Sequence, residues 1–297
     1  MTKTINFVSK TGPDFASHRM RAEIPCQIIN EESTNQAVVS ELANPRFDIN
    51  VFSKHFKPEE MFDEAYECRD RGSKVVFDIC DNHFSRDAKE IYLKMIELSD
   101  IITCNTVGMQ KKIEEVSGKK AFICSDPLTF PKGLPRVTHT KNPKIVWYGH
   151  KTNIAPVFVQ RYKFTVISNY QATMEEIRNF PHITFLPWSL GLVESLIKNF
   201  DIVVIPTVGF RHYTKEKSPN RAVDALFAGK FVITDNLDIY EELEPFIYIG
   251  DIKSGIEWYI KHPSQAFEKI EEGQKYVEKK YNYKEIYKQW KNSLSLA

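Results

Sequence analysis

The fold is decided by one stretch in the second half of the chain. It begins with Asp201-Ile-Val-Val-Ile-Pro206 and, after the loop Thr207–Lys217, continues as Ser218-Pro-Asn-Arg-Ala-Val-Asp224-Ala-Leu-Phe-Ala-Gly229-Lys-Phe-Val-Ile-Thr234. Two apolar, β-branched runs enclose a segment with helix signals, namely Ser218 at the N-cap position, a proline after it and Gly229 past the last turn. Continuous apolar runs are typical of parallel strands, which are buried on both faces. The stretch therefore predicts a strand–helix–strand unit.

The same alternation extends outward over most of the chain. We expect strands at Ile5–Ser9, Gln36–Leu42, Asp48–Ser53, Lys74–Asp78, Asp100–Cys104, Ala121–Cys124, Ile145–Tyr148, Phe164–Ser168, Ile183–Leu186, Ile202–Ile205, Phe231–Thr234 and Phe246–Ile249. We expect helices at Pro58–Arg69, Ser85–Leu98, Thr106–Val116, Ser189–Phe200 and Pro219–Ala228. The stretch 131–143 is rich in proline and polar residues and is interpreted as an interdomain linker. The pattern predicts an α/β protein with two Rossmann-like domains facing across a cleft, residues 1–135 and 136–262, followed by helices over 263–297.

Composition limits the classes of function. The 297 residues carry 40 basic and 39 acidic side chains, a net charge of +1, which argues against a dedicated nucleic-acid binder with a strong overall field. No apolar run approaches the roughly 20 residues that span a bilayer, and the N-terminus lacks the apolar core of a signal peptide. We expect a cytoplasmic protein, with peripheral association at a membrane left open. The cysteines fit buried free thiols in a reducing compartment; they are Cys26, Cys68, Cys80, Cys104 and Cys124.

The helix expected after Ser218 predicts an anion site. Its first turn has unpaired backbone N–H groups and the positive end of the helix dipole, while Arg211 and Lys217 lie in the loop before it. These features suit a diphosphate, and no cluster of metal ligands accompanies them. Asp224 follows Asn220 by one turn, and helical side chains lean toward the N-terminus, so its carboxylate is placed to accept hydrogen bonds from ribose hydroxyls. The alternative is that Asp224 only complements the helix dipole.

The stretch from Lys217 to Ile233 resembles the nucleotide-sugar-binding segment of glycosyltransferases with the two-domain GT-B fold, most nearly the retaining group of family four and its relatives. That group carries two acidic residues separated by seven others, a spacing that Glu216 and Asp224 reproduce, with Asp in place of the usual second Glu. The resemblance implies that Asp224 holds the ribose and that Glu216 belongs to the donor-binding set.

The resemblance also implies a role for the residues between these two acids. The amides near Ser218 and Asn220 would take the diphosphate, and Lys217 or Arg211 would neutralise it. In this fold the last helix commonly crosses back to the first domain, so the helices over 263–297 are expected to pack toward it.

Two further matches fall in the second domain. Ile145–Asn153 looks like the first strand and loop of the donor domain, where Gly149 lets the chain turn under the donor and Lys151 faces the phosphates. Ile183–Ser189 occupies the place where such enzymes contact the base, so Trp188 is expected to stack on it. A core or surface indole fits Trp188 equally well.

The first domain supplies the candidate catalytic residues. The expected strand at Lys74–Asp78 ends in Asp81 and His83, and in relatives a cleft-facing His or Asp near this point contacts the transferred sugar or the incoming hydroxyl. Capping of the next helix is the alternative for Asp81. The stretch Thr11–Arg21 resembles the first loop and helix of the acceptor domain.

The sequence thus predicts a metal-independent, retaining glycosyltransferase with no cofactor beyond its nucleotide-sugar co-substrate. In a retaining course the leaving phosphate takes the acceptor proton, with Lys151, Arg211 and Lys217 stabilising it, whereas an inverting course requires Asp81 or His83 as base. The expected acceptor is a hydroxyl of a polysaccharide, lipid-linked sugar or other glycan. Alternatives are transfer to modified DNA bases, nucleotide-sugar epimerisation, and binding of a nucleotide sugar without catalysis. Nucleic acid is not favoured, because a solvated helix face explains the lysines of the C-terminal tail.

Overall fold

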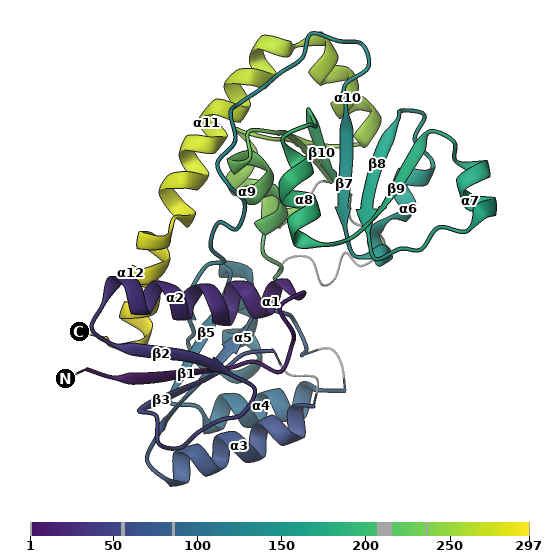
Figure 1. Ribbon diagram of the computed structural model, residues 1–297. Helices are drawn as coiled ribbons and strands as arrows, with labels where there is room; N and C mark the ends of the chain where they lie inside the picture. The colour runs from purple at the N-terminus through teal and green to yellow at the C-terminus, as the bar shows by residue number, and fades with distance from the viewer. Residues whose placement is uncertain (1, 55–56, 85–86, 207–215, 236, 297) are drawn as a thin grey trace. The chain divides into compact units, whose positions relative to one another are not determined.

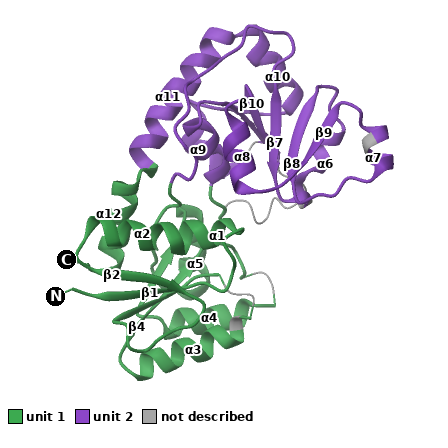
Figure 2. Cartoon of the chain, viewed as in Figure 1, with its two compact units in different colours: residues 1–127, 215–218, 281–297 green, residues 128–214, 219–280 purple. Residues whose placement is uncertain are grey.

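The computed structural model describes residues 2–54, 57–84, 87–206, 216–235 and 237–296. It consists of two compact units (Figure 2). Unit 1 comprises residues 1–127, 215–218 and 281–297, and unit 2 comprises residues 128–214 and 219–280. The chain therefore passes from one unit to the other more than once, and the short segment around Glu216 belongs to unit 1 although its neighbours in sequence belong to unit 2.

Unit 1 is a parallel sheet, here sheet A, with helices on both faces (Figure 1). The strand order is β2-β1-β3-β4-β5-β6. The strands are β1 (Thr4–Val8), β2 (Gln36–Ser40), β3 (Ile49–Phe52), β4 (Lys74–Ile79), β5 (Ile101–Cys104) and β6 (Phe122–Ile123). The helices are α1 (Ala16–His18), the π-helical turn η1 (Arg19–Glu23), α2 (Ile24–Glu32), α3 (Pro58–Asp70), α4 (Lys89–Leu98), α5 (Val107–Ser117) and α12 (Tyr283–Leu294).

The two faces of sheet A are buried in separate apolar cores. One core joins β4 to α3, α4 and α5 through buried residues such as Met61, Phe77 and Met95. The other joins β1 to α2 and α12, where the rings of Phe7 and Trp290 meet edge to face at 5.4 Å. Because both faces of the sheet are buried, the sequences of these strands are largely continuous apolar runs.

Unit 2 is a second parallel sheet, sheet B, with strand order β12-β11-β10-β7-β8-β9. Its strands are β7 (Ile145–Gly149), β8 (Phe164–Ser168), β9 (Ile183–Pro187), β10 (Ile202–Ile205), β11 (Phe231–Thr234) and β12 (Tyr248–Ile249). Its helical elements include η2 (Lys151–Asn153), α6 (Ala155–Phe158), α7 (Met174–Asn179), α8 (Leu190–Ile197), α9 (Asn220–Phe227), η4 (Asp238–Leu243), α10 (Ile252–Lys261) and α11 (Pro263–Tyr281). Trp147 of β7 is fully buried in a core shared with α6, α10 and α11.

Each strand expected from the sequence is present, and the prediction of two Rossmann-like α/β sheets is confirmed. Helix boundaries differ in three places. α8 ends at Ile197, three residues before the expected Phe200. α9 begins at Asn220 with Pro219 in the N-cap position and without a side-chain cap, so the expected cap by Ser218 is wrong. α4 begins at Lys89, later than Ser85, and residues 85–86 lie outside the described residues. Of the helices in the described ranges, none is both long and apolar enough to cross a membrane.

The stretch 131–143, expected as a linker, lies within unit 2 and packs on the end of α9. The N–H of Gly133 donates to the carbonyl of Phe227 at 3.0 Å. A Cβ on Gly133 would lie 2.1 Å from the carbonyl oxygen of Ala228, so only glycine fits at this contact. The chain first leaves unit 1 after Pro127, and in the C-terminal region α11 belongs to unit 2 up to Lys280 while α12 packs in unit 1 against α2.

Candidate functional site

Polar residues gather at the carboxyl edge of sheet A, where its parallel strands end. Asp81 follows β4, and its carboxylate forms an ion pair with the Lys54 ammonium at 2.6 Å. Burial alone would raise the pKa of Asp81, but Lys54, with smaller contributions from His83 and Lys217, lowers it below its usual value. The structure thus brings the predicted residues Asp81, His83 and Lys217 into one electrostatic neighbourhood within unit 1. The His83 ring also lies 4.8 Å from that of Tyr92.

The segment around Glu216 is fixed at the same edge of sheet A. The Thr106 hydroxyl donates a hydrogen bond to the Glu216 carbonyl at 2.9 Å and accepts one from the N–H of Met109, thereby capping α5. The Glu216 side chain is buried, and its Oε2 has no hydrogen-bond partner among the described residues. A buried carboxylate oxygen without a donor is costly, so Oε2 is a candidate atom to accept a hydrogen bond from a ligand.

Asn105 is a site residue that the sequence analysis missed. It directly follows β5, is 6% exposed and donates from Nδ2 to the carbonyl of Cys80 at 3.2 Å. Within the described part of the chain, nothing donates to its Oδ1. The signal was present, because a polar residue immediately after a buried parallel strand lies at the same edge as the end of the neighbouring strand. The same rule had identified Asp81.

At the carboxyl edge of sheet B, the end of β7 is joined to the first turn of α9. The Arg221 Nη1 donates to the carbonyl of Tyr148 at 3.2 Å, and the Tyr148 hydroxyl donates to the carbonyl of Arg221 at 3.2 Å. Gly149 has φ +151, and a Cβ there would lie 2.9 Å from Arg221 Nη1. Glycine is therefore required both by the backbone and by the guanidinium beside it. Arg221 places a cation at the start of α9, a role that the sequence analysis did not assign to it.

Other predicted binding residues of unit 2 lie at the same edge. Lys151 begins η2 directly after β7; its N–H donates to Asn169 at 3.0 Å, and its side chain is exposed. Trp188 follows β9 and is half-buried. Its backbone N–H donates to the carbonyl of Ser168 at 2.9 Å. Stacking of Trp188 on a base stays a prediction.

The remaining predicted residues differ in what the structure says of them. Asn220 is the first residue of α9, and its Oδ1 accepts a hydrogen bond from the Arg221 N–H at 2.7 Å. Ser218 is half-buried and belongs to unit 1. Arg211 lies outside the described residues.

Asp224 is buried and already accepts several hydrogen bonds. Its two carboxylate oxygens accept from the N–H and the hydroxyl of Thr129 at 2.8 and 2.6 Å, and Phe130 N–H lies at 3.4 Å. The side chain therefore holds the stretch after Pro127 against α9. Its predicted ribose contact stays a prediction. Across the ranges that the structure covers, no group of three or more His, Cys, Asp or Glu side chains is arranged to hold a metal ion.

Comparisons with known proteins support the fold. No family model and no curated protein sequence matches the chain. Among solved structures, the chain is similar over 100% of both chains to Anabaena Alr3699/HepE in complex with UDP, with a TM-score of 0.68 and 12% identity. It is also similar to an α-glucosyltransferase in complex with UDP and DNA containing a HMU base, over 99% of this chain and 100% of that one, with a TM-score of 0.70 and 10% identity. TarM matches 82% of this chain and 54% of its own length, with a TM-score of 0.62 and 12% identity. The chain therefore has the GT-B fold of nucleotide-sugar-dependent glycosyltransferases.

Proposed function

We propose that the protein transfers a sugar from a nucleotide-diphosphate sugar to a hydroxyl group of an acceptor. The observation that carries this proposal is the buried Oε2 of Glu216, an acceptor atom without a donor among the described residues. Its segment is hydrogen-bonded to Thr106, the residue after Asn105, whose Oδ1 likewise meets no described donor. Unsatisfied acceptors fit a ligand that supplies hydrogen-bond donors, and sugar hydroxyls are such donors. The fold, whose solved examples include complexes with UDP, agrees with this reading.

We assign the diphosphate of the donor to the end of sheet B. Its negative charge matches the positive end of the α9 dipole, together with the side chains of Arg221 and Lys151. The glycine at position 149 leaves room for the backbone to approach a phosphate closely. Lys217 is the further cation expected from the sequence. These groups would stabilise the leaving diphosphate without a metal ion.

We favour a retaining course for the reaction. The bond between the anomeric carbon and the donor phosphate breaks, a bond to the acceptor oxygen forms on the same face, and the acceptor proton passes to the leaving phosphate. The structural support is the Lys54–Asp81 ion pair, because a carboxylate whose pKa is lowered is a weak base at neutral pH. His83 is the remaining candidate for an inverting base. The protein then contributes orientation and electrostatic stabilisation.

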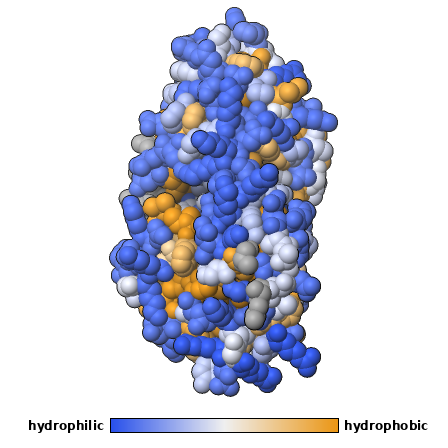
Figure 3. Space-filling view, turned by 90° about the vertical axis from the view of Figure 1, so that its left-hand side faces the viewer, coloured by the Kyte–Doolittle hydropathy of each residue, from blue (hydrophilic) through white to orange (hydrophobic). Residues whose placement is uncertain are grey.

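For the acceptor we favour a glycan or other neutral hydroxyl compound over DNA. Several lysines on α11 and α12 are paired with acids: Lys275 with Glu272 at 2.9 Å, Lys280 with Glu242, and Lys288 with Glu285. Figure 3 shows a largely hydrophilic surface on the side of the molecule where α11 lies. The solved α-glucosyltransferase complexes with DNA make modified DNA the second candidate. The five free cysteines support a reducing, cytoplasmic location.

A thermal-shift screen against nucleotide sugars and free nucleotides tests the proposal. A ligand present at 100 times its Kd stabilises the native state by about 2.7 kcal/mol, so a selective rise in Tm identifies both base and sugar. Glu216→Gln should reduce the extra shift given by the sugar while keeping the shift given by the free nucleotide. Glu115→Gln, on the exposed side of α5, is the control. Conversion of the donor without any acceptor would indicate an epimerase, and binding without turnover a binding protein.

A further inference from the structure

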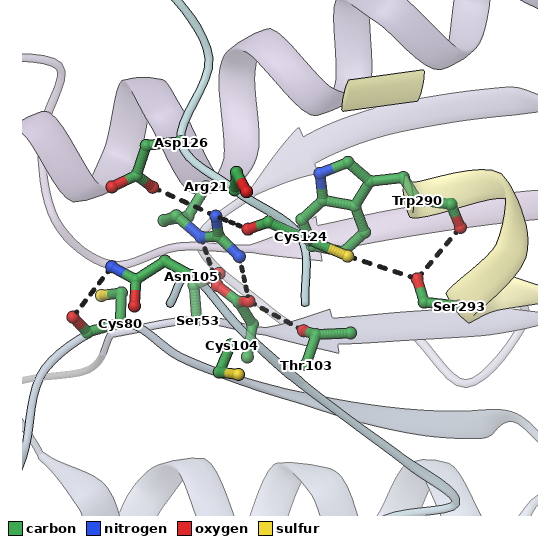
Figure 4. A network of polar contacts seen from close by, with 12 residues as sticks. Arg21, Ser53, Cys80, Thr103, Cys104, Asn105, Cys124, Asp126, Trp290 and Ser293 are labelled. Carbon is green, nitrogen blue, oxygen red and sulfur yellow. Dashed lines mark hydrogen bonds and ion pairs between the residues drawn. The ribbon is translucent and has the colours of Figure 1, made fainter. Parts of the chain in front are cut away.

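The buried guanidinium of Arg21 is the centre of a polar network in unit 1. Arg21 lies on the π-helical turn η1 and is 1% exposed. Its carbon Cζ lies 5.4 Å from the ring centre of Trp290, on α12. A π turn widens a helix locally and changes the direction of its side chains, and such turns are frequent at functional sites. Here the turn directs an arginine into the interior, close to the strand ends of sheet A (Figure 4).

The network contains two carboxylates, and both oxygens of the first one accept hydrogen bonds. Asp78, in β4, accepts from Arg21 Nε at 2.9 Å and from Nη2 at 2.5 Å. It also accepts from the hydroxyls of Ser53 and Thr103, at 3.2 and 2.7 Å. Four donors satisfy this carboxylate, and the bidentate pair balances the charge of the guanidinium. Asp78 therefore holds Arg21 in place and has little capacity for a ligand.

In the second carboxylate, that of Asp126, one oxygen accepts a hydrogen bond. It follows β6, is 6% exposed, and its Oδ1 accepts from Arg21 Nη1 at 3.1 Å. The hydrogen bonds to Asp126 from the described residues go to Oδ1 alone, and Oδ2 is not one of the fully buried atoms that lack a partner. Since Asp78 already balances Arg21, this additional buried carboxylate leaves the network with an excess negative charge. A buried charge that its neighbours do not require is costly unless another partner offsets it.

Asn105 gives an independent indication of a ligand at the same edge. It ends the neighbouring strand β5, and its buried Oδ1 has no donor in the described parts of the chain. In Figure 4, Asp126 and Asn105 lie on the same side of the Arg21 guanidinium. Asn105 Oδ1 lacks a described donor, and the hydrogen bonds to Asp126 go to Oδ1. Acceptor oxygens at neighbouring strand ends fit a ligand that supplies hydrogen-bond donors, such as a neutral polyhydroxyl group, rather than an anion.

We propose that Asp126 and Asn105 form a hydroxyl-binding subsite for a sugar substrate, with Arg21 as the positioning residue that orients Asp126. The inference rests on the proposed glycosyl transfer and adds a sugar-binding role for residues outside its donor-binding set. The sugar that the subsite binds is either the group being transferred or the acceptor. Substitutions in the subsite change the rates of hydrolysis and transfer differently in the two cases.

The test compares Asp126→Asn and Asn105→Ser with the wild-type protein, using the nucleotide sugar and free nucleotide that give the largest thermal shifts. Asn105→Ser changes no charge and breaks no ion pair, so it remains informative if Asp126→Asn fails to fold. Hydrolysis of the donor by water and transfer to a panel of free sugars are measured separately. Asp201→Asn, which removes a buried carboxylate at the opposite edge of sheet B, is the matched control and should keep both rates.

If the subsite holds the transferred sugar, hydrolysis and transfer both fall about 10-fold or more; if it holds the acceptor, only transfer falls, through KM. Affinity for the free nucleotide stays unchanged in both cases. Arg21→Lys should reproduce part of the loss, because lysine keeps the charge without the planar fork. Wild-type rates in both subsite variants would overturn the inference while leaving the proposed function intact. A wild-type protein without any donor turnover contradicts the proposed function itself, and with it this inference.

Discussion

The carboxylate of Asp224 accepts hydrogen bonds from both the N–H and the hydroxyl of Thr129, 95 residues earlier in the chain. This contact and the close approach of Gly133 to Ala228 hold the stretch that follows Pro127 against α9. The helix whose first turn we assign to the diphosphate is therefore held from the side by Thr129 and by Gly133, and Gly133 lies in the stretch 131–143 that the sequence suggested was a linker.

Asp224→Ala should destabilise unit 2 by about 1–3 kcal/mol, because it leaves a buried backbone N–H without its acceptor. Chemical denaturation of the variant measures this loss. Thr129→Val removes only the hydroxyl bond and should cost less. Affinity for the free nucleotide distinguishes the two roles of Asp224. A tenfold loss confined to Asp224→Ala would establish the predicted ribose contact, and equal affinities would limit Asp224 to holding Thr129.

Gly149→Ala should weaken nucleotide binding and lower stability by about 1–3 kcal/mol. The residue has φ +151, and its new Cβ would lie 2.9 Å from Arg221 Nη1, so both the backbone and the guanidinium must shift. Isothermal titration with the free nucleotide and thermal unfolding measure the two effects. Gly191→Ala in α8, where a Cβ meets open space, should instead stabilise by up to about 1 kcal/mol. Similar behaviour of the two variants would contradict the role given to Gly149.

The thiols should differ in reactivity according to burial. Burial raises the pKa of Cys68 to about 11 and those of Cys104 and Cys124 to about 12, and all three side chains are fully buried. The native protein at pH 8 should therefore react with a disulfide reagent first at the half-exposed Cys26, whereas denaturant should release all five thiols. Mass spectrometry of the labelled peptides identifies the sites. Rapid labelling of Cys104 or Cys124 in native protein would show that the core around Arg21 opens.

The contribution of the Lys54–Asp81 pair to folding stability should depend on pH in the acid range. Because the pKa of Asp81 is lowered in the folded state, the pair contributes stability above the pKa of the unfolded chain and loses it as pH falls through the folded pKa. Lys54→Met should thus cost about 0.5–1 kcal/mol at pH 7, and the difference from wild type should vanish once the pH has fallen below the lowered pKa of folded Asp81. Urea denaturation at a series of pH values follows this difference. A difference that persists in acid would mean that Lys54 stabilises through packing.

The alternation of apolar runs and amphipathic segments was sufficient to predict the two parallel sheets. A buried strand such as β10 needs continuous apolar side chains, and this requirement is visible locally in Ile202–Ile205. The same rule placed Asp81 and Gly149 correctly at strand ends, because the carboxyl ends of parallel strands share one edge.

What the sequence could not provide was the set of partners that each polar side chain meets. In the sequence Asp224 has the position of a ligand-binding acid, yet in the structure its carboxylate accepts a hydrogen bond from Thr129. Arg21 and Asp126 are distant in sequence and meet only because η1 and the end of β6 adjoin in unit 1. That Glu216 Oε2 and Asn105 Oδ1 meet no donor among the described residues likewise becomes recognisable only in the tertiary structure. Local propensity determines strands and helices, whereas hydrogen-bond satisfaction depends on contacts between segments far apart in the chain, and only the tertiary structure determines those.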